Sequence, residues 1–134
     1  TVTIVLTLAV ALIAVVFLFI RSNNTVGAKT SQEAAQGFVE AVNSDDYEKA
    51  SNYVYYENDD IRKDVKKELK DKDKIQTSLH RHMYKTYKDY KIVSVDELGD
   101  EARVTLKRES EPGKIVYSDF KMKKVDDRWY CDIM

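Results

Sequence analysis

The chain opens with an uninterrupted hydrophobic run and then changes to short, spaced hydrophobic patterns. Residues 1–20 contain no charged side chain, and all 22 Lys and Arg and all 23 Asp and Glu residues follow them. A helix needs about 20 apolar residues to cross a bilayer, and a lone segment in lipid satisfies its backbone N–H and C=O groups only as a helix. The run predicts a transmembrane helix over residues 1–21, a polar linker over residues 22–29 and a folded domain over residues 30–134.

A cleaved signal peptide is the alternative interpretation of the run, because Val26, Gly27 and Ala28 resemble a small-residue cleavage site. The run is longer than the ~7–15 apolar residues of a signal peptide, and these small residues lie well beyond its end. We therefore favour an uncleaved anchor. Arg21 and Lys29 are too few to fix its orientation, and the folded domain is placed outside the cytoplasmic membrane because that arrangement is the commoner one.

Two helices are predicted directly after the linker. Thr30 and Glu33 have the spacing of a capping box. The apolar stripe that follows at helical spacing consists of Ala34, Ala35, Phe38, Ala41 and Val42. The first helix should end at Asn43 and Ser44, and Asp45 should cap the second. The apolar edge of that second helix consists of Tyr47, Ala50, Tyr53 and Val54.

A highly charged helix is expected over residues 57–74. Its only apolar residues, at intervals of four, are Ile61, Val65 and Leu69. This pattern predicts a surface helix with a narrow buried stripe. The stripe is interrupted near residues 71–74, and a further helix should run to about Tyr84.

From residue 91 the hydrophobic period changes to two, which is typical of strands. Strands are predicted over residues 91–98, 101–110, 114–125 and 128–134, with turns at residues 99–100, 112–113 and 126–127. The side chains expected on the inner face are Ala102, Val104, Leu106, Val116, Ser118, Phe120, Met122, Trp129, Cys131 and Ile133. The predicted fold is α+β, with three or four helices packed on a curved, four-stranded antiparallel sheet.

Two segments resemble a known superfamily. AAQGFVEAVNSDDYEKA (residues 34–50) resembles the opening of small membrane-anchored bacterial members of the nuclear-transport-factor-two-like, or cystatin-like, superfamily, and FKMKKVDDRWYCDI (residues 120–133) resembles their last hairpin. The resemblance implies a cone-shaped domain whose sheet wraps round the first helix. Relatives include isomerases and dehydratases, domains of secretion and conjugation machines, and a stalk-like domain of some penicillin-binding proteins. The fold alone does not choose between these functions.

Charge, cysteine and histidine content exclude several classes of function. The net charge is −1, so no overall field attracts a polyanion, and no nucleic-acid partner is expected. The single Cys131 cannot form a disulfide or a thiolate cluster within the chain. His80 and His82 would point away from each other on a helix and could not readily share a metal. No phosphate-binding or dinucleotide motif is present, so no cofactor is expected.

Catalysis is not expected either. Asp119 and Asp132 lie on predicted strands out of phase with Phe120 and Trp129, so both carboxylates should face solvent. An enzyme of this fold needs a carboxylate or an Asp–His pair with a shifted pKa inside the cone, and no residue is assigned to that role. A cone that instead held a small apolar ligand would be lined by Phe38, Val42, Tyr53, Phe120 and Trp129.

Basic and aromatic residues alternate over residues 80–91. Such a tract can bind an anionic chain by charge and stacking, which outside a cell would be a wall polymer or lipid headgroups. The cations of this candidate patch are Arg81, Lys85, Lys88 and Lys91. We favour the simpler interpretation that Tyr84, Tyr87 and Tyr90 bury their rings at a helix-to-strand junction and keep their hydroxyls in water.

The function expected from these features is protein–protein contact. A membrane-anchored extracytoplasmic domain without a catalytic set is suited to be a subunit of an envelope, secretion or conjugation assembly, with a protein partner or a homo-oligomer. Binding of a small apolar ligand and binding of an anionic polymer are the alternatives.

Overall fold

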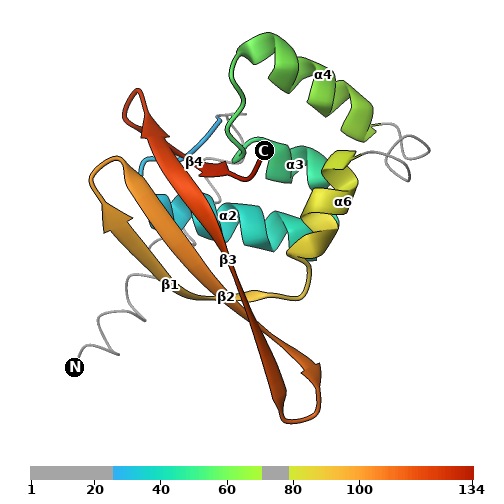
Figure 1. Cartoon of the computed structure of the whole chain (residues 1–134). Coiled ribbons are helices and arrows are strands. Elements are labelled where there is room, and N and C mark those ends of the chain that lie inside the picture. Colours follow the sequence, from blue (N-terminus) through green and yellow to red (C-terminus); the bar gives the residue numbers. More distant parts are fainter. Residues whose placement is uncertain (1–25, 71–78) are drawn as a thin grey trace.

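The computed structural model describes residues 26–70 and 79–134, which form an α+β fold. Helices α2 (Ser31–Asn43), α3 (Tyr47–Ser51), α4 (Asp59–Lys70) and α6 (Leu79–Thr86) precede strands β1 (Lys91–Leu98), β2 (Glu101–Glu111), β3 (Lys114–Val125) and β4 (Arg128–Asp132). The strands form one antiparallel sheet in the order β1-β2-β3-β4 (Figure 1). The predicted succession of helices and meander is confirmed, and it agrees with the fold that the nuclear-transport-factor-two-like resemblance implies.

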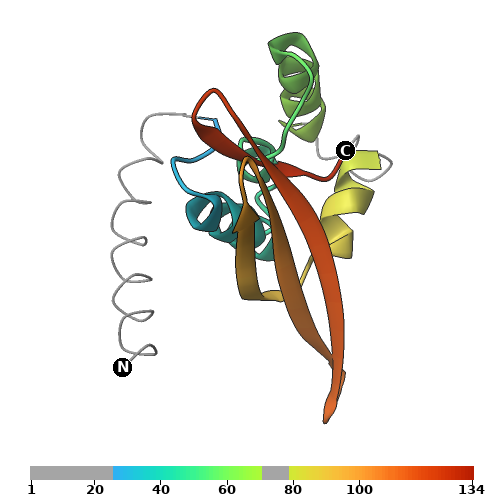
Figure 2. The same cartoon turned by 60° about the vertical axis from the view of Figure 1, so that its left-hand side comes forward.

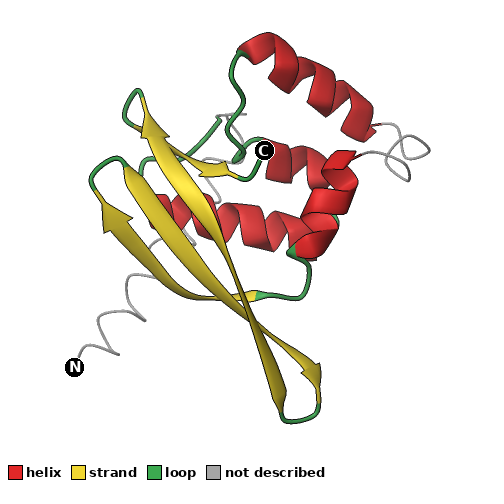
Figure 3. Cartoon of the chain, in the orientation of Figure 1, coloured by secondary structure: helices red, strands yellow, loops and turns green. Residues whose placement is uncertain are grey.

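The helices gather beside one part of the sheet, and the rest of the sheet extends beyond them. α2 contacts both outer strands, β1 and β4, so it crosses the width of the sheet. The turn between β2 and β3 lies away from helices α2, α3, α4 and α6 (Figures 2 and 3). The predicted transmembrane helix lies outside the described residues, and within the described ranges no helix is both long and apolar enough to cross a bilayer.

The first helix forms as its sequence predicts. The Thr30 hydroxyl accepts a hydrogen bond from the backbone N–H of Glu33 at 3.1 Å, which satisfies one of the free N–H groups of the first turn. α2 ends at Asn43, with Ser44 as its C-cap. Its predicted apolar stripe is entirely buried: Ala34, Ala35, Phe38, Ala41 and Val42.

The cap of the second helix was predicted one residue too early. The side chain of Asp46, not Asp45, accepts the N–H of Lys49 at 3.1 Å and caps α3. Asp45 has a left-handed backbone, with φ of 58°, a conformation that Asp tolerates better than most residues. Its carboxylate turns to a hydrogen bond from the Tyr47 hydroxyl at 3.1 Å instead.

The buried stripe of α4 also differs from the prediction. Val65 and Leu69 are buried, but Ile61 is 37% exposed and Arg62 is buried in its place. The Arg62 guanidinium lies over the rings of Tyr56 and Tyr130, 5.3 and 5.4 Å from their centroids. Such cation–π contacts stabilise a buried guanidinium, so the helix turns this face inward. The predicted continuation over residues 71–74 lies outside the described residues.

The sheet presents its apolar face to the helices as the alternation predicts. The inward positions that are buried are Ala102, Val104, Leu106, Phe120, Met122, Trp129 and Cys131. Val116 and Ser118 are half-buried, because they lie on the part of β3 that approaches the exposed β2–β3 turn. Ile133 packs against the core from just beyond β4.

Candidate functional site

The two edges of the sheet differ in their backbone pairing. On the β4 edge, Ala28 and Trp129 exchange two backbone hydrogen bonds of 3.1 and 2.7 Å. Further along the same edge, the carbonyl oxygen of Cys131 accepts a hydrogen bond from the N–H of Tyr55 at 2.9 Å. The N–H of Cys131 donates to the carbonyl oxygen of Tyr53 at 2.6 Å. Segments from before α2 and after α3 therefore seal the β4 edge.

The β1 edge has no such cover among the described residues. Over residues 91–96, β1 makes backbone pairings to β2 on one side, and no other described backbone segment bonds to it. Asn43 of α2 fixes the start of the strand, since its side-chain amide accepts the N–H of Asp89 at 2.7 Å and donates to the carbonyl of Tyr90 at 3.2 Å. Ser31 fixes the other end, where its hydroxyl donates to the Glu97 carboxylate. Residues 91–96 are thus an open stretch between two fixed points.

A groove of about 590 Å³ runs beside this open stretch, between β1 and α2. Its apolar lining includes Val39 of α2 and Ile92, Val93 and Val95 of β1. Its polar lining from α2 consists of Gln32, Gln36, Glu40 and Asn43. Val93 is 48% exposed. Unpaired backbone and apolar side chains therefore lie together at this edge.

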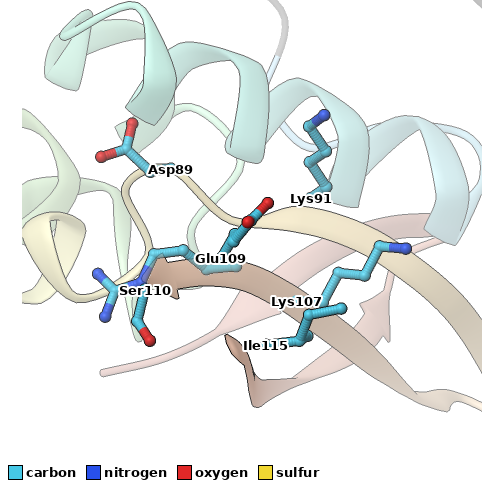
Figure 4. A pocket seen from close by; sticks show the side chains of 7 residues that line it. Asp89, Lys91, Lys107, Glu109, Ser110 and Ile115 are labelled. Atoms are coloured by element: carbon cyan, nitrogen blue, oxygen red, sulfur yellow. The ribbon is translucent and has the colours of Figure 1, made fainter. Parts of the chain in front are cut away.

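A second hollow, of about 710 Å³, lies where the β1 edge meets β2 (Figure 4). Lys91 and Lys107 lie directly opposite each other on the two strands and both line it. Like charges in this position repel each other. The ion pairs among the described residues involve other cations, so neither lysine has a carboxylate partner in that part of the chain. Glu109, also in the lining, accepts the N–H of Gly113 at 3.0 Å.

The candidate polyanion patch is divided by the fold. Lys88 forms an ion pair with Asp45, with 2.6 Å between the ammonium nitrogen and the carboxylate oxygen. Lys91 instead belongs to the hollow on the sheet, together with Lys107 and Arg108. The remaining two patch residues, Arg81 and Lys85, lie on α6. The preferred interpretation of the interleaved aromatics is confirmed for their rings, since Tyr84 and Tyr90 are buried and Tyr87 packs against the core. The Tyr84 hydroxyl does not lie in water as expected, because it is buried 3.3 Å from the Tyr56 hydroxyl.

Replacing Lys88 by methionine should raise the pKa of Asp45 toward its ordinary value. The hydrogen bond from Lys88 is the main cause that holds this pKa low, and the Tyr47 hydroxyl adds to it. A lowered folded-state pKa means that the pair stabilises the fold above the unfolded-state pKa and that this contribution is lost as pH falls through the folded-state pKa. Carboxyl NMR titration measures the shift. Lys85→Met is the matched control, and an unchanged pKa in Lys88→Met would contradict the assignment.

The five side chains expected to line a ligand pocket all lie in the hydrophobic core. Phe38, Val42, Tyr53, Phe120 and Trp129 are each no more than 4% exposed. Phe38 makes edge-to-face ring contacts there: its ring centroid lies 5.7 Å from that of Tyr84, 5.8 Å from that of Tyr87 and 5.6 Å from that of Phe120. The two hollows described above are lined by other residues.

Neither Asp119 nor Asp132 is enclosed by the fold. Asp119 is exposed and pairs with Arg103 at 3.2 Å. Asp132 is half-buried at the end of β4. No three His, Cys, Asp or Glu side chains of residues 26–70 and 79–134 are placed to hold a metal ion, and the side chains of His80 and His82 lie outside the described part. The Cys131 thiol is buried, which raises its pKa well above the ordinary value and disfavours the nucleophilic thiolate.

Comparisons with known proteins bear on the fold. A search of curated proteins gives no match. A solved structure of an NTF-2 like protein of unknown function from Shewanella oneidensis MR-1 is similar over 74% of this chain and 88% of its own, with 18% identity and a TM-score of 0.39. A family model described as a domain of unknown function, DUF4878, matches residues 24–132. Because this match covers most of the sequence, the chain belongs to the DUF4878 family.

Proposed function

We propose that the chain is a membrane-anchored, extracytoplasmic protein-interaction domain that binds its partner along the open edge of β1. The observation that supports it is the difference between the two sheet edges, one sealed by four backbone hydrogen bonds and the other without backbone cover among the described residues. An exposed strand edge presents unpaired backbone N–H and C=O groups and is a template for pairing with another chain. The uncharged run over residues 1–20 supports the membrane anchor.

An extended segment fits this site better than a globular surface does. A strand added to an open edge gains main-chain hydrogen bonds, and alternate side chains enter the pockets beside it. Here the groove next to β1 offers the apolar surface of Val39, Ile92 and Val95 to such side chains. Affinity would come from the backbone and selectivity from the groove and from the charges of the outer face.

Binding without catalysis also fits the interior of the domain. The aromatic side chains round Phe38 contact one another edge to face, so the apolar-ligand alternative gains no support from them. A place in an envelope, secretion or conjugation assembly remains our proposal for the role of the anchored domain, because such assemblies use non-catalytic domains of this fold.

A photo-crosslinking residue at Val93 tests the proposed interface in membranes that contain the full chain. We expect one defined ultraviolet-dependent adduct, identified by mass spectrometry. The matched control is the same crosslinker at Lys63, an exposed position on α4, which should give none. Absence of an adduct at Val93, or equal adducts at both positions, would contradict the proposal.

A further inference from the structure

We infer that the partner at the open β1 edge is a second copy of this chain, paired antiparallel through its own β1. This inference rests on the proposed function and names the partner. Lys91 of each copy lies opposite Asp96 of the other, and Ile92 lies opposite Val95. A twofold axis between residues 93 and 94 relates the copies, so the same patch serves both sides of the interface.

An irregularity in β1 makes this register compatible with the faces of the sheet. Ile92 lies opposite Leu106 of β2. Ser94 lies opposite Thr105, the adjacent residue of β2, so Val93 has no partner and forms a bulge. A regular strand points residues an odd number of positions apart to opposite faces. The bulge shifts this alternation by one residue, and positions five apart on either side of it share a face.

Lys91 and Asp96 are such a pair of positions. Lys91 lies opposite Lys107, and Asp96 lies opposite Arg103. All four side chains are exposed on the outer face. In the antiparallel pairing of two copies, each Lys91 therefore meets Asp96 on the same side of the joined sheet, as opposite residues in an antiparallel pair must.

The charges on this face are complementary between copies and poorly satisfied within one. Lys91 faces the like charge of Lys107 and has no carboxylate partner in the described part of the chain. Asp96 accepts a hydrogen bond from the Ser94 hydroxyl at 3.3 Å. The nearest cation in register, Arg103, pairs with Asp119 instead. A second copy supplies an acid beside Lys91 and a base beside Asp96, which makes two attractive contacts across the axis.

The apolar residues and the length of the open stretch fit the same pairing. Ile92 and Val95 both pack against the core from the inner face, so their contact across the axis extends the core from one copy into the other. Val93, 48% exposed, lies next to the axis. The stretch is bounded by the contacts of Asn43 and Ser31, which leave residues 91–96 free, and the register uses all of them.

Charge exchange between Lys91 and Asp96 tests this register in the full chain in mild detergent. Lys91→Glu and Asp96→Lys should each weaken dimerisation roughly tenfold or more, because two attractive contacts become repulsive. An equimolar mixture of the two variants should restore a heterodimer, and the double variant should restore a homodimer. Sedimentation velocity over a concentration series measures the dimer.

Lys63→Glu and Asp64→Lys on α4 are matched controls, because they make the same charge changes at exposed positions away from the edge. Circular dichroism confirms that each variant is folded. A wild-type monomer at all concentrations, single variants that dimerise normally, or a mixture that does not recover would each overturn the inference. If one of these outcomes occurs and Val93 crosslinks to a different protein, the edge still binds a partner and only the inferred identity of the partner is wrong. If Val93 crosslinks to nothing, the proposed function fails as well.

Discussion

Replacing Phe38 by alanine should lower the free energy of unfolding by about 3–5 kcal/mol, the range found for large-to-small changes of buried aromatics. Phe38 is fully buried, and its ring makes edge-to-face contacts with Tyr84, Tyr87 and Phe120. Alanine removes all of these contacts and leaves a cavity where α2, α6 and β3 meet. Since whole domains are stable by only about 5–15 kcal/mol, this single change should leave the fold marginal.

Equilibrium unfolding in guanidinium chloride measures the loss, with Phe38→Leu as the matched control. Leucine keeps part of the apolar volume and should cost less than alanine. If the alanine variant is already partly unfolded without denaturant, its folded baseline cannot be fitted. The leucine variant then still shows whether the free energy of unfolding falls. A loss below about 1 kcal/mol for alanine would mean that Phe38 does not lie at the centre of the core.

The strands and turns could be predicted because their determinants are local. Alternation of Ala102, Val104 and Leu106 fixes which face of β2 is buried, whatever the strand pairs with. Asp126 and Asp127 both adopt positive φ, 52° and 63°, as the tight turn at that point requires. The same locality explains the cap at Thr30, whose partner lies three residues away.

The predictions were wrong where a residue distant in sequence determines the local structure. Asp45 and Asp46 are equivalent as caps by residue type, and Lys88, far along the chain, takes the carboxylate of Asp45. On α4 a helical spacing of four favoured Ile61 over Arg62. The rings of Tyr56 and Tyr130 reverse that choice, and the position of Tyr130 depends on the register of the sheet.

The candidate site depends still more on distant pairing. Lys91 was singled out from the sequence with the basic residues that precede it, but its neighbours in space are Lys107 and Arg108. These neighbours can be predicted only if the pairing register of β1 and β2 is known. Likewise, no local signal in the sequence identifies β4 as the sealed edge, because Ala28 and Tyr53, which bond to it, lie far from it in the sequence.

Replacing Gly27 by alanine should lower the free energy of unfolding by about 2–5 kcal/mol, the sum of about 1–2 kcal/mol for a left-handed backbone and about 1–3 kcal/mol for a steric clash. Gly27 has φ of +66°, and an added Cβ would lie 2.8 Å from Tyr130 Cε1 and 2.9 Å from the Trp129 carbonyl oxygen. That oxygen accepts the N–H of Ala28 in the pairing that seals β4. The backbone there cannot yield without loss of the pairing, so residues 26–28 should move away from the sheet.

Gly99→Ala is the matched control for this prediction. Gly99 has nearly the same φ, +65°, but nothing lies within 4 Å of an added Cβ. This variant should lose only about 1–2 kcal/mol of unfolding free energy, the effect of the left-handed backbone alone. Equilibrium unfolding compares the two variants, and hydrogen exchange at the Trp129 N–H, which bonds to Ala28 at 2.7 Å, should accelerate only in Gly27→Ala. Equal costs and equal exchange would mean that residues 26–28 do not seal β4. In that case only the pairing of Tyr53 and Tyr55 with Cys131 would cover β4, and the difference between the two edges that assigns binding to β1 would be smaller.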